Sequence, residues 1–197
     1  MKLLTQSPKK ALKAFLKQRP SADEGIKFKK NLIELLNKTN IIEKQPKDET
    51  EEHLKNNLRD FLRDTYYIDT NAINTKDKKD LVIHISKSTN TDVAVIIEAK
   101  RPSNKVEMIT ENNLHKKAFY ELIFYYLTER NAKENIVLKQ LIITDTNQWF
   151  IIDANQFDKH IYRNTQIRNL YQNKINDKKD NPFVAYHSPK FAPTIWR

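Results

Sequence analysis

The sequence predicts an α/β sandwich, in which helices flank a mixed central sheet and further helices precede it. Three observations support this class. Residues 51–65 repeat apolar side chains at helical spacing, residues 81–85 and 93–99 are short runs rich in β-branched residues, and residues 111–130 return to the helical period. From Glu51 onward the expected order is helix, three strands, helix and strand, followed by one more strand and one more helix.

Two helices are expected before this core. Residues 8–18 have the pattern of a short basic amphipathic helix, which Pro20 ends. Ser21 is placed to cap a second helix over residues 22–43. We interpret residues 1–46 as an N-terminal helical arm.

The first helix of the core is expected over residues 51–65, with Thr50 or Asp48 as its cap. Residues 66–73 are aromatic and β-branched and predict a strand. Residues 74–79 predict a charged turn that leads to the next strand.

The second and third strands are expected over residues 81–85 and 93–99, with a turn at residues 86–91 between them. The later run is almost entirely apolar, as expected of a strand at the centre of a sheet. Pro102 ends it, because proline cannot donate to the ladder of hydrogen bonds.

The second half of the core begins with a long helix. The expected elements are a helix over residues 111–130, a buried strand over 138–144, a turn at 145–147, a strand over 149–152, and a final helix capped by Asp153 or Asn155 that extends to about residue 172. The main domain then spans residues 47–175, and residues 176–197 form an irregular, proline-containing tail.

Composition limits the classes of function. The formal net charge is +10, and a basic domain attracts polyanions such as nucleic acid, although a lysine-rich surface without that partner has the same composition. The absence of Cys excludes thiol nucleophiles, disulfides and cysteine zinc sites. The single glycine, Gly25, excludes the glycine-rich loops that bind nucleotide phosphates.

The N-terminal residues lack the apolar core of a signal peptide, and no apolar run approaches the length needed to cross a membrane. We therefore expect a cytoplasmic protein without a membrane partner.

Three charged residues are expected to meet at one edge of the sheet. Side chains alternate faces along a strand, so Glu98 and Lys100 project from the same side. Asp80 begins the preceding strand, and a hairpin places that end beside Glu98. Two carboxylates at this spacing suit a hard divalent cation such as Mg²⁺, which activates a bound water and neutralises charge on a phosphodiester. Lys100 is then placed to assist that water.

The same pattern has a simpler interpretation, in which Glu98 and Lys100 form an ion pair at the exposed end of a strand. Short motifs such as E-x-K arise by chance, although this is the one E-x-K in the chain. Glu51 and Glu121 favour a site, because each lies on the apolar face of its helix, where a carboxylate is costly without a partner. The alternatives are a carboxylate that complements the helix dipole at Glu51 and an exposed position at Glu121.

Four segments of the chain resemble a known family. They read EEHLKNNLRDFLRDTYY from residue 51, KKDLVIH from residue 78, VIIEAKRPSN from residue 95 and ITDTNQWFIIDA from residue 143. They are similar to the amino-terminal cleavage domain of Type IIG restriction–modification enzymes, which are PD-(D/E)xK nucleases. The resemblance implies the helix–three strands–helix–strand core of those nucleases and an endonuclease that hydrolyses DNA with Mg²⁺, for which Mn²⁺ is expected to substitute.

The resemblance also implies roles for individual residues. Asp80 and Glu98 correspond to the metal-binding carboxylates, the backbone carbonyl of Ala99 to a further ligand, and Lys100 to the catalytic lysine. The helix glutamate of the family corresponds to Glu51.

Supporting positions follow the family less closely. Many relatives carry Q-x-x-x-Y on the next helix, where this chain has Glu121 and Tyr125, so glutamate replaces glutamine. Glu52 is the alternative to Glu51 on the first helix, and Lys79 stands where the family name has proline. The chain has neither the length nor the glycines for the methyltransferase and target-recognition regions of Type IIG enzymes. We therefore expect a fragment, a truncated gene product or a stand-alone nuclease subunit, with those regions or subunits as possible partners absent from this chain.

Double-stranded DNA is the expected partner. The candidate phosphate contacts lie on the polar side of the first core helix and after the third strand, and they are Lys55, Arg59, Arg101, Asn104 and Lys105. Each also fits an ordinary solvated surface position, and phosphate contacts position DNA without reading its sequence. The five histidines show no paired metal-ligand spacing, which disfavours a histidine–metal nuclease.

Two other functions stay open. The first is a catalytically silent DNA-binding or assembly module with the same fold, which would bind DNA after loss of Asp80 and Glu98 and would not cleave it. The second is a protein whose basic surface has no nucleic-acid partner, for which DNA binding would be absent or independent of salt.

Overall fold

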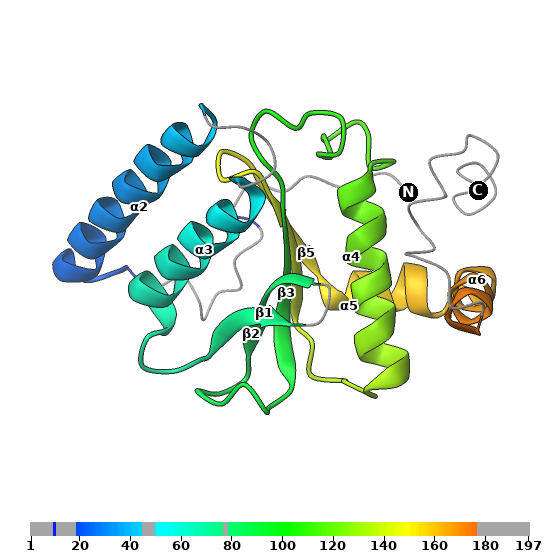
Figure 1. Cartoon of the computed structure of the whole chain (residues 1–197). Helices are drawn as coiled ribbons and strands as arrows, with labels where there is room; N and C mark the ends of the chain where they lie inside the picture. The colour runs from blue at the N-terminus through cyan, green and yellow to red at the C-terminus, as the bar shows by residue number, and fades with distance from the viewer. Residues whose placement is uncertain (1–9, 11–18, 45–49, 77–78, 177–197) are drawn as a thin grey trace.

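The computed structural model describes residue 10 and residues 19–44, 50–76 and 79–176. This part of the protein is a mixed α/β fold in which a five-stranded sheet is flanked by helices (Figure 1). The strands are β1 (Ile73–Lys76), β2 (Lys79–His84), β3 (Val93–Ala99), β4 (Gln140–Thr144) and β5 (Trp149–Asp153). The α-helices are α2 (Ala22–Ile42), α3 (Thr50–Leu62), α4 (Lys117–Leu127), α5 (Ala154–Phe157) and α6 (Thr165–Asn176).

The sheet is mixed, as the sequence predicts. Its strand order is β1-β2-β3-β4-β5. The pair β3–β4 is parallel and the other three pairs are antiparallel. The central strand β3 has the predicted bounds, and all seven of its residues are buried. Its apolar sequence, interrupted only by Glu98, is explained by burial of both faces of the strand.

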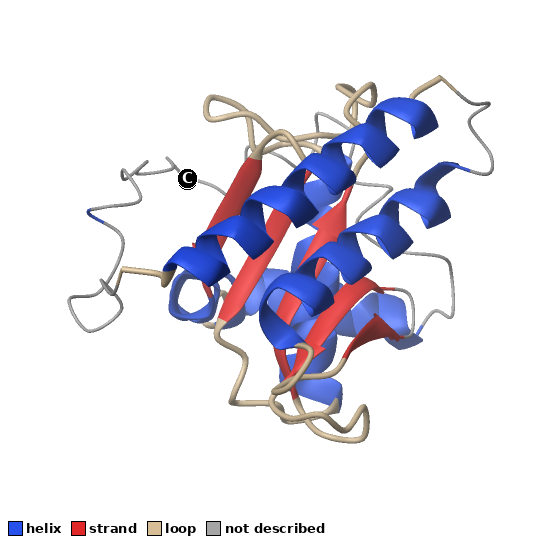
Figure 2. Cartoon of the chain, turned by 90° about the vertical axis from the view of Figure 1, so that its left-hand side faces the viewer, coloured by secondary structure: helices blue, strands red, loops and turns tan. Residues whose placement is uncertain are grey.

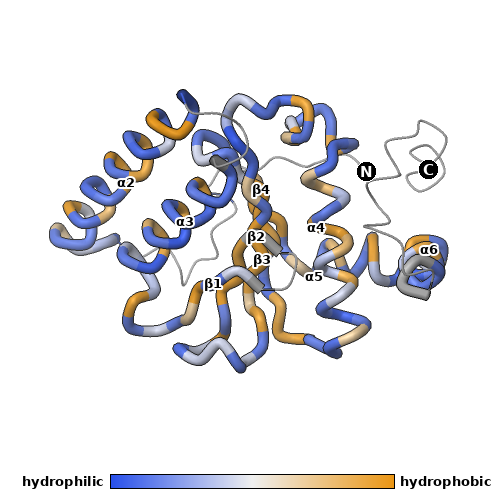
Figure 3. The backbone as a smooth tube through the Cα atoms, viewed as in Figure 1, coloured by the Kyte–Doolittle hydropathy of each residue, from blue (hydrophilic) through white to orange (hydrophobic). Residues whose placement is uncertain are grey.

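The two faces of the sheet are covered by different helices. Helices α2 and α3 lie side by side across one face, which Figure 2 views from the front, and α4 lies against the other. One apolar core therefore packs Leu35 and Leu58 against the sheet, and a second packs Phe119 and Leu122 from the opposite side. Figure 3 shows the same arrangement, with hydrophobic residues along the strands and alternating stretches on α2 and α3.

Helix α2 begins at the predicted cap. The side chain of Ser21 accepts a hydrogen bond from the backbone N–H of Glu24, and the Glu24 carboxylate accepts one from the backbone N–H of Ser21. This reciprocal capping box satisfies two N–H groups that a helix start leaves without partners. The expected helix over residues 22–43 is confirmed.

The strand predicted over residues 66–73 is wrong in most of its length. Helix α3 continues instead into a π-helical turn, Arg63–Tyr67, and β1 begins only at Ile73. Tyr66 packs edge-on against Phe61 on the same helix, so its aromatic side chain stabilises a helical surface. The turn predicted over residues 74–79 is also wrong, because β1 and β2 extend into it from both sides.

The long helix predicted over residues 111–130 begins later than expected. Residues 111–116 form a loop, and α4 starts at Lys117. Leu114 lies in this loop and its side chain is buried. Its sequence spacing from the apolar residues of α4 therefore resembles that of a helix, although its backbone is not helical. Beyond Leu127 the chain continues as a π-helical turn to Ala132.

The final helix is divided into two. Asp153 caps α5 as predicted, by accepting a hydrogen bond from the N–H of Asn155. A π-helical turn, Asp158–Tyr162, follows, and α6 starts after Asn164, whose side chain accepts hydrogen bonds from two N–H groups of its first turn. A second capping residue thus interrupts the predicted single helix.

Some predicted features lie outside the described residues. These are the helix over residues 8–18 apart from residue 10, the Asp48 cap, the side chain of Asp80, and residues 177–197 of the tail. Among the helices that the structure does describe, none combines the length and the apolar character needed to cross a membrane.

Candidate active site

Charged side chains from four separate segments converge where β3 ends. We call this group the Lys100 cluster, and its members are Glu51, Glu98, Lys100, Glu107, Lys117 and Glu121. The cluster lies between the first turn of α3, the end of β3, the loop over residues 100–116 and the first turns of α4. In Figure 1 this loop runs over the top of the sheet toward the start of α4.

The ammonium group of Lys100 is the centre of the cluster. Its Nζ lies 2.6 Å from Oε1 of Glu98 and 2.8 Å from Oε2 of Glu121. The carboxylates of Glu107 and Glu51 lie further out, at 3.6 and 3.8 Å from the same nitrogen. Lys100 therefore draws together four carboxylates, of which the most distant in the sequence, Glu51 and Glu121, are 70 residues apart.

Burial makes these ion pairs necessary. The side chains of Lys100 and Glu98 are 4% and 1% exposed, and that of Glu121 is 12% exposed. An isolated charge at such a position would have a desolvation cost of several kcal/mol, and an opposite charge in contact offsets much of it. The Lys100–Glu98 pair is thus a buried ion pair, in contrast to the exposed pair that is the simpler interpretation of the sequence.

The strand explains how Glu98 and Lys100 come together. They are two residues apart, so the alternation of a strand places both side chains on the same side. The backbone N–H of Lys100 donates to the carbonyl of Thr144, which extends the pairing of β3 with β4 past Ala99. Both side chains are therefore attached to backbone that the sheet holds in place.

Two helices supply the other predicted carboxylates. Glu51 lies in the first turn of α3, where its side chain is 44% exposed, and its neighbour Glu52 is exposed. Glu121 lies in α4, one turn after Lys117. Tyr125, one turn further along α4, is buried in the core between α4 and the sheet. Of the two first-helix candidates, it is Glu51 that reaches Lys100.

Glu107 was not among the predicted site residues. It lies in the loop over residues 100–116, and its carboxylate bridges Lys100 and Lys117, with Oε1 3.0 Å from the Lys117 Nζ. Burial acts to raise the pKa of Glu107, but the hydrogen bond from Lys117 and the charges of both lysines hold it below its ordinary value. The buried neighbours Met108 and Ile109 anchor this part of the loop.

Lys117 is a second member of the cluster that was not among the predicted site residues. It is the first residue of α4, and it contacts Glu107 at 3.0 Å and Glu121 at 3.9 Å. Its spacing from Glu121 is the i, i+4 spacing that places two side chains on one helix face. This spacing is the feature of the sequence that could have predicted Lys117 as a neighbour of Glu121. No comparable signal exists for Glu107, because a loop brings it into the cluster.

The described side chains of the cluster are suited to a divalent cation by charge. Four carboxylates and two ammonium groups leave a net charge of −2 when all are ionised. Carboxylate oxygens are also the donors that Mg²⁺ prefers. Within the described part of the chain, no group of three or more His, Cys, Asp or Glu side chains has a metal-binding arrangement.

Asp80, the expected partner of Glu98 in metal binding, has its backbone in β2. The antiparallel register pairs Leu81 with Ile97, so residue 80 is the next position toward the end of β3 that carries Glu98. Its side chain lies outside the described residues.

The predicted phosphate contacts after β3 differ in exposure. Arg101 is buried, and its Nε donates to the carboxylate of Glu43 at 3.1 Å. The Asn104 side chain accepts a hydrogen bond from the N–H of Glu107. Lys105 is 65% exposed and lies 3.2 Å from the fully buried carboxylate of Asp145. Lys105 is thus the most accessible of the three.

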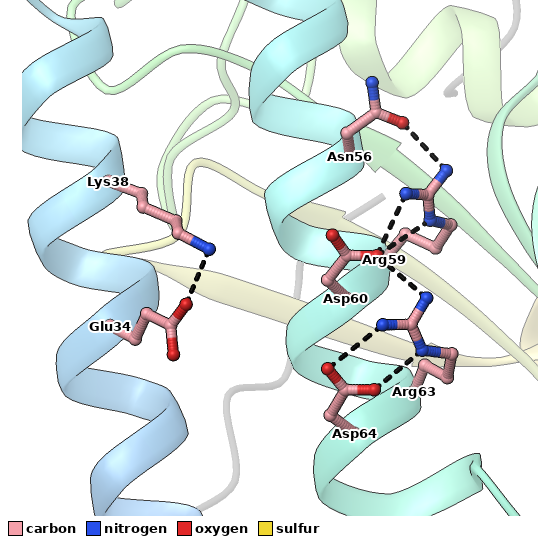
Figure 4. A network of polar contacts seen from close by, with 7 residues as sticks. All are labelled: Glu34, Lys38, Asn56, Arg59, Asp60, Arg63 and Asp64. Carbon is pink, nitrogen blue, oxygen red and sulfur yellow. Dashed lines mark hydrogen bonds and ion pairs between the residues drawn. The ribbon is translucent and has the colours of Figure 1, made fainter.

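On α3, Arg59 belongs to a different network. Its guanidinium donates to Asn56 at 2.9 Å and to Asp60 at 2.9 Å, as Figure 4 shows together with the next pair along the helix, Arg63 and Asp64. Lys55, on the same helix, is half-buried. Arg59 is therefore already held by its own helix.

A surface hollow of about 270 Å³ lies between α2 and α3, away from the cluster. It is lined by Lys38, Ile41, Ile42, His53, Asn56 and Asn57. None of these residues belongs to the Lys100 cluster, so this hollow and the charged cluster are separate features of the surface.

Comparison with known proteins identifies a family without an assigned activity. A family model described as a domain of unknown function, DUF7149, matches residues 6–188. Neither a curated protein nor a solved structure is significantly similar to the chain. Because the family match covers most of the sequence, the protein belongs to the DUF7149 family.

Proposed function

We propose that this protein is a metal-dependent DNA endonuclease of the PD-(D/E)xK type, whose active site is the Lys100 cluster. The supporting observation is the convergence of Glu98, Lys100, Glu51 and Glu121 on one point at the end of the central strand. These side chains come from the helix–strand–helix positions that the sequence resemblance names. The net charge of +10 suits a polyanionic substrate.

In this proposal Mg²⁺ is held by Asp80, Glu98 and the backbone carbonyl of Ala99, with Mn²⁺ as a substitute. The ion supplies charge neutralisation and lowers the pKa of a bound water. Glu98 is suited to this role because the sheet fixes its backbone, so little ordering remains to be done when the ion binds. Glu51 and Glu121 complete the acidic surroundings.

Lys100 has a specific role in the proposal. Its ammonium group holds the four carboxylates together before metal or DNA is present. With an ion present, Glu98 would hold the ion, and Lys100, paired with Glu98, would position the attacking water and stabilise the charge that develops on the phosphodiester. Because Lys100 is 4% exposed, it acts from within the site and does not meet DNA directly.

The test is cleavage of supercoiled plasmid by the purified protein with Mg²⁺ or Mn²⁺, with EDTA as the metal-free control. We expect nicked and linear products with either metal and none with EDTA. Lys100→Ala should lower the rate by a factor of roughly 10² to 10⁴, the usual range for loss of an acid–base group. Cleavage by Lys100→Ala at the rate of the parent would remove the mechanism.

A catalytically silent DNA-binding or assembly module is the second candidate function. The observation in its favour is the enclosure of Lys100 by four carboxylates, because such a buried cluster can serve to hold α3, β3 and α4 together. The two functions differ in outcome. A silent module binds DNA, leaves plasmid intact with either metal, and binds equally well after Glu98→Gln.

A further inference from the structure

Two lysines belong to the Lys100 cluster, and they differ in access to solvent. The side chain of Lys100 is 4% exposed, whereas that of Lys117 is 29% exposed. Both contact Glu107 and Glu121, so they lie on the inner and outer sides of the same two carboxylates. Of the two lysines, Lys117 is therefore the one that a large substrate approaching from solvent can reach.

The contacts of Lys117 leave it able to bind an anion. An ammonium group has three N–H donors, and the hydrogen bond to Oε1 of Glu107 uses one of them. Its distance of 3.9 Å to Glu121 is a charge contact beyond hydrogen-bonding range. Lys100, in contrast, donates to Glu121 at 2.8 Å and lies 2.6 Å from Glu98.

The position of Lys117 is fixed by more than its own side chain. It opens α4, and the N–H of the next residue, Ala118, donates to the backbone carbonyl of Glu107. Glu107 thus joins the loop to the helix start through both its backbone and its carboxylate. The Lys117 ammonium is held at the rim of the cluster before any substrate arrives, which reduces the ordering cost of a contact made there.

From these observations we infer that Lys117 is the lysine that contacts the phosphodiester, while Lys100 acts as the buried counter-ion that organises the carboxylates. This inference rests on the proposed nuclease function and assigns a substrate contact to a residue outside the E-x-K motif. Lys117 is a point charge on a flexible stem, which suits a phosphate oxygen. The hydrogen bond from Lys117 to Glu107 keeps the ammonium group at this position.

The first test uses lysine acetylation of the parent protein, with and without duplex DNA, in Ca²⁺ so that cleavage does not intervene. Mass spectrometry gives the modification rate at each lysine. The matched control is Lys87, which is 62% exposed, pairs with an aspartate at 3.8 Å as Lys117 pairs with a glutamate, and lies in the turn at the opposite end of the sheet. We expect DNA to slow acetylation of Lys117 severalfold and to leave Lys87 unchanged.

The second test measures the salt dependence of DNA affinity for Lys117→Ala, Lys117→Arg and the control Lys87→Ala. Loss of one phosphate contact lowers the slope of log affinity against log salt by about 0.9. We expect that decrease for Lys117→Ala, and the slope of the parent for Lys117→Arg and Lys87→Ala. A parent-like slope for the arginine variant would show that the positive charge at this position, and not the lysine side chain itself, determines the salt dependence.

Either of the two tests can overturn the inference. In one, the parent binds DNA but Lys117 is acetylated equally fast with and without it. In the other, Lys117→Ala keeps the full salt slope, or Lys87→Ala loses as much. If the parent binds no DNA at any salt concentration, the proposed nuclease function itself is wrong, and the assignment of Lys117 is wrong with it.

Discussion

Replacing Lys100 by methionine should destabilise the fold strongly at neutral pH. Methionine keeps a similar length and removes the charge, which leaves the buried carboxylate of Glu98 without its partner at 2.6 Å. Removal of one member of a buried ion pair costs about 3–5 kcal/mol. For a domain with a stability of about 5–15 kcal/mol, that loss is a large fraction of the total.

The same reasoning predicts coupling between the two members of the pair. Glu98→Gln alone leaves the Lys100 ammonium with one close carboxylate fewer and should also destabilise. The double variant has neither buried charge, so its loss should be smaller than the sum of the two single losses by about 0.5–3 kcal/mol or more. Lys117→Met is the control, because a partly exposed pair contributes only about 0.2–1 kcal/mol.

The assay is urea unfolding followed by tryptophan fluorescence, to which Trp149 contributes from its place against the core between the sheet and helices α2 and α3. Equal slopes of unfolding free energy against urea for the parent and the four variants would show that all unfold from the same kind of native state. The reasoning is refuted if Lys100→Met costs less than Lys117→Met, or if the losses of Lys100→Met and Glu98→Gln are additive.

Three further predictions concern the fold. Gly25→Ala should raise the free energy of unfolding by about 0.5–1 kcal/mol, because Gly25 lies within α2 and an added Cβ meets nothing within 4 Å; a lower urea midpoint would contradict this. Leu58→Ala should lower it by about 2–5 kcal/mol, since Leu58 is fully buried, whereas Ile33→Ala, at an exposed position, should change it by less than about 0.5 kcal/mol; equal losses would contradict the core assignment. Asp158→Asn should destabilise at pH 7 and not in acid. Burial acts to raise the pKa of Asp158, but the hydrogen bond and charge of Arg130 hold it below its ordinary value, so the stabilisation is present above that ordinary value and is lost as the pH falls through the folded one. Thermal unfolding from pH 7 to 3 measures the difference, and a constant difference would contradict the ion pair.

The features that the sequence predicted correctly are those that neighbouring residues determine. The run over residues 93–99 is apolar on both faces except at Glu98, which is typical of a central strand. Ser21 and Glu24 form a capping box from neighbouring residues, so local sequence was enough to place the start of α2. The E-x-K triplet at the end of β3 placed Glu98 and Lys100 on one side for the same local reason.

The errors have a common physical origin in contacts between distant residues. Tyr66 has the β propensity of an aromatic residue, yet it packs on Phe61 and on Phe28 of α2, which keeps its segment helical. Leu114 is buried although it lies in a loop, and its apolar side chain led to the wrong start of the predicted helix. Glu107 enters the site from that same loop, and no spacing rule relates it to Lys100. Tertiary packing decided each of these positions.

The measurement that tests the nuclease proposal most directly is plasmid cleavage by a matched pair of variants, Glu98→Gln and Glu129→Gln. Both glutamates are buried and each lies within 3.2 Å of a lysine ammonium. Glu129, however, lies in the π-helical turn after α4 and pairs with Lys133, away from the Lys100 cluster. The control therefore reproduces the loss of a buried carboxylate without touching the site.

With Mg²⁺, the proposal predicts that Glu129→Gln cuts plasmid at a rate close to that of the parent and that Glu98→Gln produces no detectable nicks at a temperature where both remain folded. Equal cleavage by the two variants, or a parent that cuts with neither Mg²⁺ nor Mn²⁺, would contradict the claim that the cluster around Lys100 hydrolyses DNA.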